Sequence, residues 1–402
     1  MNIIFIGGAF WGPNKSKIIA NSIGLIQNAA DVLQHNYIEG IASNAAVSEI
    51  IVLNAVYIGS YPRKYLHPYY TPAIKEQRIE KLKIIDFSFL NLPGIKHISR
   101  FNIIFIALLK LLKTKKHSDV IVICYAMHLP FLAAIYLNKL LNKNIRTCLI
   151  VPDLPEFMAT RSGIKKIPYV ISAKIGYAIA NKFTYIAVIT SGMLEKFNKV
   201  KNSVVIEGIA SKKNTSSASI RTTDYGRYFL YSGTLDARYG IIEMLNAFEK
   251  SSLGNLKLII CGDGDSREHV IARAKKNTQI IFLGQLDRDE VLELQKKAVA
   301  LLNPRRDVSL FTKYSFPSKI IEYMNSGRPV LMYKLPGIPV EYYNFCYVID
   351  PSDGGLALAM QKLATTPESK LMATGKSAKE FIERYKTPKY QTNKLINLFK
   401  DS

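Results

Sequence analysis

Apolar runs of strand length alternate with segments of helical periodicity from one end of this chain to the other. The runs expected to be strands in the first half are Ile3–Ile6, Ile50–Leu53, Val120–Cys124, Thr147–Val151 and Tyr185–Thr190. Those in the second half are Arg227–Tyr231, Leu256–Cys261, Ile280–Leu283, Ala298–Leu302, Pro329–Met332 and Cys346–Ile349. Buried strands that are separated by helices form parallel sheets with helices on both faces, so the pattern predicts an α/β protein.

Small and polar residues separate the two series of strands. The stretch 211–226 opens with Ser-Lys-Lys-Asn-Thr-Ser-Ser-Ala-Ser, which cannot form a packed core and is typical of a linker. A chain of 402 residues is long enough for two domains of similar size. We therefore expect Rossmann-like domains over 1–210 and 227–385, with a final helix over 386–402 that can pack back on the first domain.

The segment Val120–Leu137 carries no formal charge and is long enough to suggest a transmembrane helix. His128 and Pro130 interrupt it, and a strand Val120–Tyr125 followed by a turn and a helix Phe131–Leu141 accounts for it better. The chain begins with a strand pattern and shows no signal peptide. These features predict a cytoplasmic protein.

The net charge of +23 calls for an acidic partner. Residues 62–146 hold fifteen Lys and Arg against four Asp and Glu. A solvated basic surface, a surface for anionic lipid or a pyrophosphate-linked acceptor, and a nucleic-acid surface are the three explanations. No nucleic-acid partner is expected, because no zinc-finger spacing, basic zipper or aromatic RNA-binding motif accompanies the charge. The four cysteines lie far apart and are typical of reduced core residues.

Two glycine-containing corners follow neighbouring strands of the second half. Gly233 and Thr234 lie in the loop Ser232–Gly240, which leads into a helix whose N-terminus can meet a phosphate. Gly262 and Gly264 follow the next strand, at the end where parallel sheets bind their ligands. Tight turns without a ligand are the alternative interpretation of each corner.

The sharpest motif is Tyr314–Val330, which predicts a short helix with Pro317 in its first turn and Gly327 past its end. Lys319 opposes the helix dipole there, which suggests a nearby anion. Glu322 shares the same helix face, so a ribose diol beside a diphosphate would fit the pair. A surface Lys-Glu pair without a ligand is the alternative.

These residues resemble the C-terminal half of retaining glycosyltransferases with two Rossmann domains that face each other across a cleft (GT-B), in particular family 4, which builds bacterial surface polysaccharides. The matching stretches are Tyr231–Leu235, Tyr239–Ile241, Ile260–Gly264, Phe282–Gly284, Asn303–Arg305, Phe316–Lys319, Glu322–Met324 and Gly327–Val330. The resemblance covers about residues 228–350.

The resemblance implies a donor site. It implies that Glu322 binds the donor ribose hydroxyls and that the region of Leu283 and Gly284 lines the base pocket. It also implies that the backbone around Phe316–Ser318, including Pro317, holds the sugar or phosphate.

Two departures concern charge. Family members commonly carry a glutamate at the place of Tyr314, and an Arg and a Lys at the places of Thr234 and Tyr239. The nearby basic residues that can substitute for the missing pair are Arg238, Arg305, Arg306 and Lys319.

The N-terminal half resembles the family's acceptor domain less strongly. The loop Tyr125–Pro130 matches the one that in the family carries a histidine near the reacting sugar, which makes His128 the catalytic candidate; a structural histidine is the alternative. Gly8, after the first strand, and Asp153 and Glu156, after a later strand, are acceptor-side candidates. A solvated loop is the alternative for the two carboxylates.

We therefore expect transfer of a sugar from a UDP- or GDP-type nucleotide sugar to a growing glycan, lipid-linked in surface polysaccharide synthesis, with retention of configuration. Retention rests on the resemblance alone. No cofactor and no metal are expected, since the sequence shows no histidine cluster, and the protein is expected on the inner face of the cell membrane. A GT-B sugar-nucleotide epimerase and a basic nucleic-acid-binding protein are the alternatives. A nicotinamide dehydrogenase would need a Gly-x-Gly-x-x-Gly pattern that Gly7–Gly12 lacks.

Overall fold

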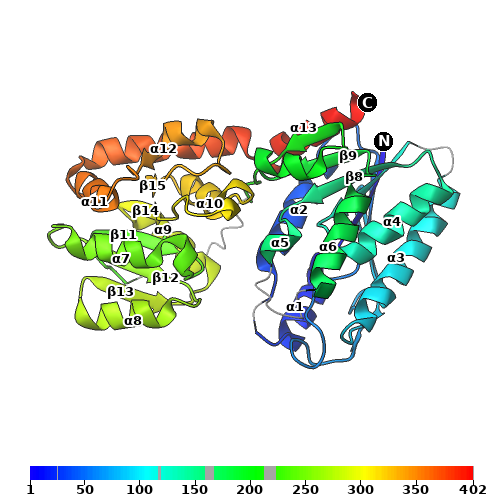
Figure 1. The fold of residues 1–402 in the computed structure, drawn as a ribbon, viewed down its shortest axis with the longest axis horizontal. Helices are drawn as coiled ribbons and strands as arrows, with labels where there is room; N and C mark the ends of the chain where they lie inside the picture. The colour runs from blue at the N-terminus through cyan, green and yellow to red at the C-terminus, as the bar shows by residue number, and fades with distance from the viewer. Residues whose placement is uncertain (25, 116–118, 159–166, 212–222, 402) are drawn as a thin grey trace. The chain divides into compact units, whose positions relative to one another are not determined.

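The structure is a computed structural model, shown as a ribbon in Figure 1. It describes the whole chain except residues 25, 116–118, 159–166, 212–222 and 402. The chain forms two compact units: unit 1 comprises Met1–Ser211 and Pro388–Ser402, and unit 2 comprises Lys212–Thr387. The expected linker 211–226 lies mostly outside the described residues.

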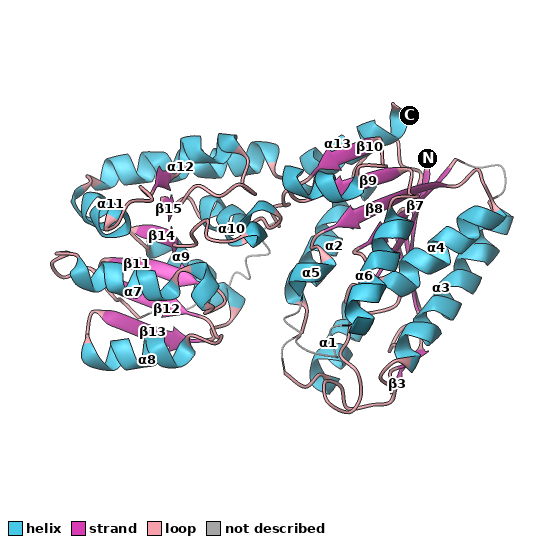
Figure 2. Cartoon of the chain, in the orientation of Figure 1, coloured by secondary structure: helices cyan, strands magenta, loops and turns pink. Residues whose placement is uncertain are grey.

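Eight strands form the large sheet of unit 1, in the order β10-β9-β8-β7-β1-β2-β5-β4 (Figure 2). Every neighbouring pair is parallel except β4 and β5. The strands are β1 (Asn2–Gly7), β2 (Glu49–Asn54), β4 (Glu76–Ile79), β5 (Leu82–Asp86), β7 (Val120–Tyr125), β8 (Arg146–Val151), β9 (Tyr185–Val188) and β10 (Asn202–Val205). A separate antiparallel pair consists of β3 (Tyr69–Tyr70) and β6 (Phe89–Leu90).

The five strands predicted for this half are present, but five others were not predicted. Among the missed strands, β10 is only half-buried along its length and β5 alternates buried with half-buried positions. Strands that are only partly covered carry no continuous apolar run, because polar side chains occupy their open positions. The α/β class and the parallel sheet are confirmed.

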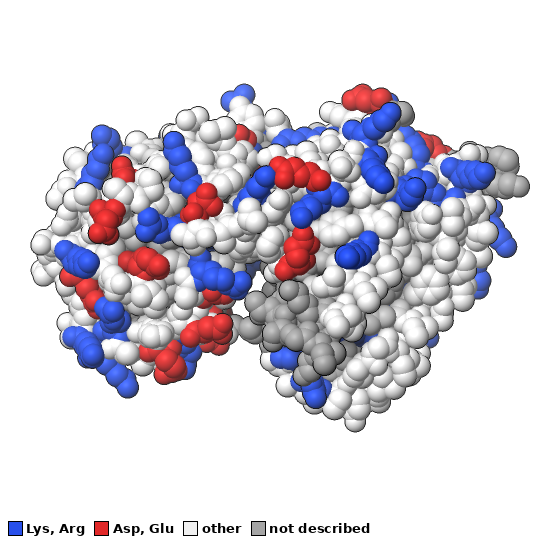
Figure 3. All heavy atoms as spheres, in the orientation of Figure 1, with Lys and Arg blue, Asp and Glu red and all other residues white. Residues whose placement is uncertain are grey.

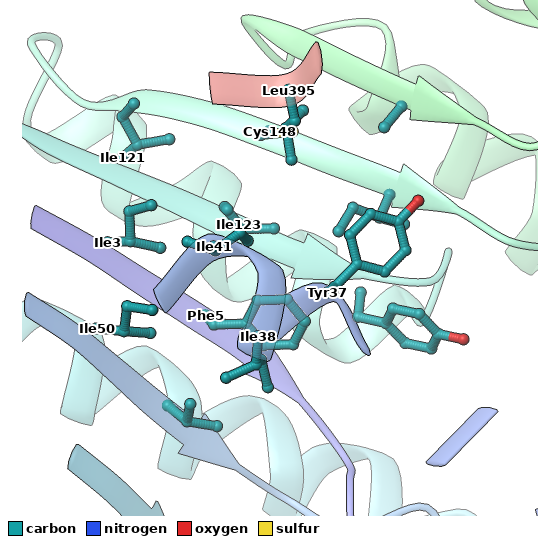
Figure 4. Close-up of a cluster of buried hydrophobic side chains, with 14 of the residues drawn as sticks. Ile3, Phe5, Tyr37, Ile38, Ile41, Ile50, Ile121, Ile123, Cys148 and Leu395 are labelled. Carbon is teal, nitrogen blue, oxygen red and sulfur yellow. The ribbon is translucent and has the colours of Figure 1, made fainter. Parts of the chain in front are cut away.

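Helices cover both faces of this sheet. They are α1 (Gly12–Asn21), α2 (Asn28–Ala42), α3 (Ile95–Thr114), α4 (Leu129–Leu141), α5 (Pro155–Met158), α6 (Ile167–Ala180) and α13 (Pro388–Lys400), with a 3-10 helix η2 (Ser191–Phe197). Tyr37, Ile38 and Ile41 of α2 pack against alternate residues of β1, β2 and β7, as Figure 4 shows. On the other face, α3 and α4 lie side by side (Figure 1), with α6 next to α4.

Helix α13 follows unit 2 in the sequence but belongs to unit 1. Its Leu395, Ile396 and Phe399 are buried in the core that α2 and the sheet share. Gly40 of α2 lets the two helices approach, because a Cβ there would lie 2.3 Å from the Pro388 carbonyl oxygen. The helix therefore completes the core of unit 1.

The uncharged segment Val120–Leu137 is a strand and a helix, as predicted. Strand β7 ends at Tyr125 and α4 begins at Leu129. No helix in the described part of the chain is long and apolar enough to cross a membrane.

Unit 2 contains six parallel strands in the order β13-β12-β11-β14-β15-β16. They are β11 (Tyr228–Ser232), β12 (Lys257–Cys261), β13 (Ile280–Gly284), β14 (Ala300–Asn303), β15 (Val330–Met332) and β16 (Tyr347–Val348). The helices are α7 (Ile241–Lys250), α8 (Arg267–Lys276), α9 (Arg288–Lys297), α10 (Lys319–Asn325), α11 (Gly355–Thr365) and α12 (Glu368–Tyr385), with 3-10 helices η3 (Ala237–Tyr239), η4 (Leu310–Lys313) and η5 (Val340–Phe345). All six strands predicted for this half are present within one or two residues of their expected bounds.

All four cysteines are free thiols. Cys124, Cys148 and Cys261 are buried in strands, and Cys346 is half-buried just before β16. Three of the four therefore lie in the core, as predicted, whereas Cys346 is only half-buried.

Candidate functional site

The glycine corners of unit 2 meet at one edge of its sheet. The amide of Gly233, after β11, donates to the Cys261 carbonyl at 3.0 Å, and the amide of Gly262 donates to the Gly284 carbonyl at 2.7 Å. A Cβ on Gly262 would lie 1.8 Å from the Gly233 carbonyl oxygen, and φ there is 140°. Only glycine fits this position. Since β11 lies between β12 and β14, the corners surround the point where the strand order reverses, which is where open α/β sheets bind ligands.

The other predicted residues of these corners differ in exposure. Thr234 is exposed, Leu283 is half-buried, and Gly264 lies against the backbone of Leu235. The Phe316 side chain is buried, with its ring 5.5 Å from that of Tyr342. It belongs to the core, so only the backbone of Phe316 can face a ligand.

The start of α10 differs from the prediction. Lys319 is the first helical residue and Ser318 precedes it as the N-cap residue. Pro317 therefore lies before the helix and not in its first turn, and its carbonyl oxygen accepts a hydrogen bond from the Ile320 amide at 2.9 Å. Gly327 follows the helix with φ of 81°, as predicted.

Glu322 is held by a network from three elements. Its Oε1 accepts hydrogen bonds from Lys319 Nζ at 2.8 Å and from Gln295 Nε2, on α9, at 2.7 Å. The Tyr323 hydroxyl accepts from the Ser232 amide at 2.8 Å and donates to the Ser232 carbonyl at 2.9 Å. These contacts fix α10 against the end of β11. Gln295 and Tyr323 were not predicted as site residues.

The Glu322 carboxylate is an ionised acceptor. Burial alone would raise its pKa, but the ammonium of Lys319 and the hydrogen bond from Gln295 bring the pKa below its ordinary value. No hydrogen bond to Oε2 forms within the described part of the chain, so this oxygen can accept from a ligand. The position of Lys319 at the start of the helix suggested a nearby anion. The ion pair with Glu322 already offsets part of this positive charge.

Three of the four basic residues that could replace the missing cationic pair already have hydrogen-bond partners within unit 2. Lys319 pairs with Glu322. Arg238 is exposed, and its Nε lies 3.0 Å from both carboxylate oxygens of Asp236. Arg306 donates from Nη2 to the Pro351 carbonyl oxygen at 2.7 Å.

Arg305 differs from these three. It follows β14, is 5% exposed, and its guanidinium carbon lies 4.4 Å from the Phe311 ring centroid and 5.4 Å from that of Tyr239. Nη1 lies 3.4 Å from the Ser315 hydroxyl, whereas Nη2 is buried and has no hydrogen-bond partner among the described residues. A buried guanidinium with an unused donor is costly unless a ligand accepts from it.

The first unit brings Gly8 and His128 to the corresponding place in its own sheet, because β1 lies between β2 and β7. The Gly8 amide donates to the Gln34 side chain at 2.8 Å, and a Cβ on Gly8 would lie 2.7 Å from the Tyr57 ring. His128 is the N-cap residue of α4, and its ring centroid lies 5.6 Å from that of Tyr57 and 4.5 Å from that of Phe131. Tyr57 is a further candidate beside His128 that sequence reasoning missed.

His128 is a neutral imidazole at physiological pH. Burial lowers its pKa well below 6.5, and the nearby charges of Arg100, His97 and Lys96 lower it further. Its Nδ1 is buried and has no hydrogen-bond partner in the described part of the chain. This unused atom leaves the functional interpretation of His128 open beside the structural one.

The two acceptor-side carboxylates lie beyond the end of β8. Asp153 is exposed. Glu156 accepts a hydrogen bond from the Tyr177 hydroxyl at 2.6 Å and lies 3.4 Å from Lys196 Nζ. Glu156 therefore has partners within unit 1. Desolvation by the surrounding protein raises the pKa of the Asp153 carboxyl to about 6, so Asp153 differs from a fully solvated carboxylate of a free loop. Among the described residues, no group of three or more His, Cys, Asp or Glu is arranged to hold a metal ion.

A comparison with protein families finds a match for unit 2. Residues 212–381 match the family model described as "Glycosyl transferases group 1". Unit 2 is therefore similar to group 1 glycosyltransferases over most of its length. The match spans less than half of the chain and leaves unit 1 outside it. No curated protein matches the sequence.

Solved structures show the same two-domain fold around the group 1 domain. Sucrose-phosphate synthase from Thermosynechococcus elongatus is 13% identical, with a TM-score of 0.65 and coverage of 100% of this chain and 99% of that one. An alpha,alpha-trehalose-phosphate synthase (UDP-forming) from Burkholderia xenovorans, in complex with glucose-6-phosphate, is 12% identical, with a TM-score of 0.61 and coverage of 99% and 100%. TarM from S. aureus, in complex with Fondaparinux, alpha-GlcNAc-glycerol and UDP, is 17% identical, with a TM-score of 0.52 and coverage of 85% and 66%. At these identities the likeness shows the GT-B fold.

Proposed function

We propose that this protein transfers a sugar from a nucleoside diphosphate sugar, bound by unit 2, to a glycan acceptor bound by unit 1. The group 1 domain supports glycosyl transfer as the reaction class. The observation that carries the donor assignment is the Glu322 carboxylate, which is ionised and fixed by Lys319 and Gln295, and whose Oε2 accepts no hydrogen bond from the described residues. An acceptor of this kind suits a pair of ribose hydroxyls.

The diphosphate of the donor is proposed to lie between the glycine corners and Arg305. The corners offer backbone at close approach, and Arg305 offers a buried donor that lacks a partner in the described part of the chain. Electrostatic stabilisation of the leaving diphosphate by preorganised donors is a large part of catalysis in such reactions. UDP is favoured as the product because TarM binds UDP and the Burkholderia synthase is UDP-forming.

The acceptor is proposed to be a lipid-linked glycan at an anionic membrane surface, with retention at the anomeric carbon. Retention and the link to surface polysaccharides rest on the resemblance of the motifs. Unit 1 supports the membrane part, because its adjacent helices α3, α4 and α6 expose many large apolar side chains. These are Ile95, Ile98, Ile106, Leu137, Leu140, Leu141, Ile167, Ile171 and Ile175.

Figure 3 shows a broad surface with few charged groups over these helices. Exposed lysines border it at the end of α3, at Lys110 and Lys113. An apolar surface of this kind bordered by cations suits an anionic bilayer.

A thermal-shift panel of UDP-, GDP-, dTDP- and ADP-sugars tests the donor assignment. A sugar nucleotide at a hundred times its dissociation constant should stabilise the protein by about 2.7 kcal/mol. Stabilisation by none of them would refute the proposal. Product analysis without an acceptor then separates transfer from epimerisation, because an epimerase would release a free sugar.

A further inference from the structure

Basic side chains gather in unit 1 where α3 and α4 begin. Lys96, His97 and Arg100 lie in the first two turns of α3, and His128 immediately precedes α4. The ring centroids of His97 and His128 are 5.7 Å apart. These four residues, the basic cluster, therefore combine side chains from two neighbouring helix N-termini, as the adjacent starts of α3 and α4 allow (Figure 1).

Two members of the basic cluster are deeply buried and only partly satisfied. Lys96 is 8% exposed and Arg100 is 2% exposed. Lys96 Nζ donates to the Ile58 carbonyl oxygen at 3.0 Å, and Arg100 Nη2 donates to the Val56 carbonyl oxygen. Arg100 Nε and His128 Nδ1 are buried without a hydrogen-bond partner in the described part of the chain. Both atoms can therefore form a hydrogen bond with a ligand.

No carboxylate among the described residues compensates the charge of the basic cluster. Burial, together with the positive charge of Arg100, lowers the pKa of Lys96 to about 8, and burial lowers the pKa of Arg100 to about 10. Neither α3 nor α4 has an acidic residue in its first turn, so both helix dipoles add positive potential. Buried charge without a counterion is strongly unfavourable. An anion is the partner that this arrangement lacks.

We propose that the basic cluster binds a phosphate or diphosphate group of the acceptor, an inference that rests on the proposed glycosyl transfer. The cluster includes the catalytic candidate His128, whose ring centroid lies 5.6 Å from that of Tyr57. His97 is exposed and gives the cluster a side open to solvent. Ile95 and Ile98, exposed on the same first turns of α3, offer an apolar surface for a lipid chain esterified to that phosphate.

Calorimetric titration of inorganic pyrophosphate into the full chain tests the site. It is done with the best nucleoside diphosphate present at saturation, so that the donor site is filled. Wild type is expected to bind, and Lys96→Met is expected to bind about tenfold more weakly, because a hydrogen bond to a charged group is lost. Lys143→Met removes the same charge from an exposed position after α4 and should leave the affinity unchanged.

A second variant protects the test against misfolding. His97→Ala changes an exposed residue and should also weaken pyrophosphate binding while the thermal transition stays intact. If Lys96→Met and His97→Ala both bind as wild type does, or if wild type binds no pyrophosphate, the proposed site does not exist. Nucleotide affinity measured alone reports on unit 2. If wild type binds pyrophosphate but no nucleotide, the donor assignment is refuted and the basic cluster is not.

The source of the phosphate is distinguished by two further ligands. Farnesyl diphosphate in neutral phosphatidylcholine vesicles represents a lipid carrier, and glucose-1-phosphate represents a soluble sugar phosphate. Tighter binding of farnesyl diphosphate than of pyrophosphate, lost in Lys96→Met, supports the lipid-linked acceptor. Preference for glucose-1-phosphate, lost in the same variant, supports the phosphate site and overturns the lipid chain.

Discussion

At the scale of single residues, side chains of the same type differ in their hydrogen-bond and ion-pair partners. Arg238 and Arg305 are both near the first glycine corner. Arg238 is exposed and forms an ion pair with Asp236, whereas Arg305 is buried and its Nη2 has no hydrogen-bond partner among the described residues. Sequence motifs named both residues as substitutes for the missing cationic pair. Only the environment ranks them, because a cation without a local anion gains most from a phosphate.

Glu322→Ala should weaken nucleoside diphosphate binding by at least tenfold, because hydrogen bonds to a charged group contribute about 1.5–3 kcal/mol each. Glu322→Gln keeps one acceptor and should lose less. The ribose is remote from the bond that breaks, so the loss should appear first in donor affinity, measured by calorimetry. A 2′-deoxyribose analogue should bind wild type more weakly than the natural nucleotide does. Glu322→Ala should bind the two ligands with similar affinity. A folded alanine variant with wild-type affinity would refute the donor site.

Arg305→Met and Arg238→Met form a matched pair for the diphosphate. Arg305→Met should lower the affinity for the nucleoside diphosphate about tenfold and leave that for the nucleoside unchanged. Arg238→Met should lose less, since Asp236 already neutralises Arg238. Calorimetry with both ligands measures the difference. Equal losses in the two variants would contradict the ranking of the two arginines.

His128→Ala should lower kcat by a large factor, on the order of 10², while donor affinity stays near wild type. Because burial and the neighbouring cations depress the pKa of His128, it stays neutral as pH falls from 8 to 6.5 and protonates only well below 6.5. A kcat profile for wild type should therefore show no His128 ionisation between pH 6.5 and 8. A variant that unfolds at room temperature would support the structural interpretation.

At the scale of elements, strands were predictable where the sequence carries an apolar run, which includes the partly exposed edge strands β13 and β16. The central strands of both sheets gave continuous apolar runs, whereas β5 and β10 mix polar and half-buried positions and β4 is exposed. The site was predictable only in part. Glu322 and Lys319 share one short motif, but Gln295 reaches Glu322 from a helix 27 residues earlier in the sequence, and its role depends on tertiary packing.

Leu395→Ala in α13 should destabilise unit 1 by about 2–5 kcal/mol, because a fully buried side chain is truncated in its core. Leu358→Ala, at an exposed position of α11, is the matched control and should change stability by less than about 0.5 kcal/mol. Chemical denaturation measures both. Nucleotide affinity should survive Leu395→Ala, since the donor candidates all lie in unit 2. Loss of nucleotide binding by the folded variant would contradict that independence.

At the scale of the whole molecule, the excess of positive charge is concentrated in the unit that also exposes apolar helices. Unit 1 holds both the basic residues of 62–146 and the exposed apolar side chains of α3, α4 and α6. Charge attracts an anionic bilayer over a distance of about a Debye length, and apolar side chains hold the protein at contact.

Wild type should sediment with vesicles of anionic lipid at low salt and leave them as ionic strength rises. Ile98→Ser on α3 should reduce the bound fraction without loss of stability, because Ile98 is 63% exposed. Leu358→Ser, 64% exposed on unit 2, is the control and should bind as wild type does. Equal recovery of wild type with neutral vesicles would remove the electrostatic part of the proposal.

The return of α13 to unit 1 has a consequence for biosynthesis. Unit 2 is an insertion within unit 1, since residues 212–387 separate the two segments that share one core. During translation all of unit 2 is made before the last segment of unit 1, and domains fold as they are completed. Unit 2 should therefore fold first on the ribosome, while unit 1 waits for Leu395, Ile396 and Phe399. A premature stop codon a few residues before the end would damage the earliest-synthesised domain and spare the later one.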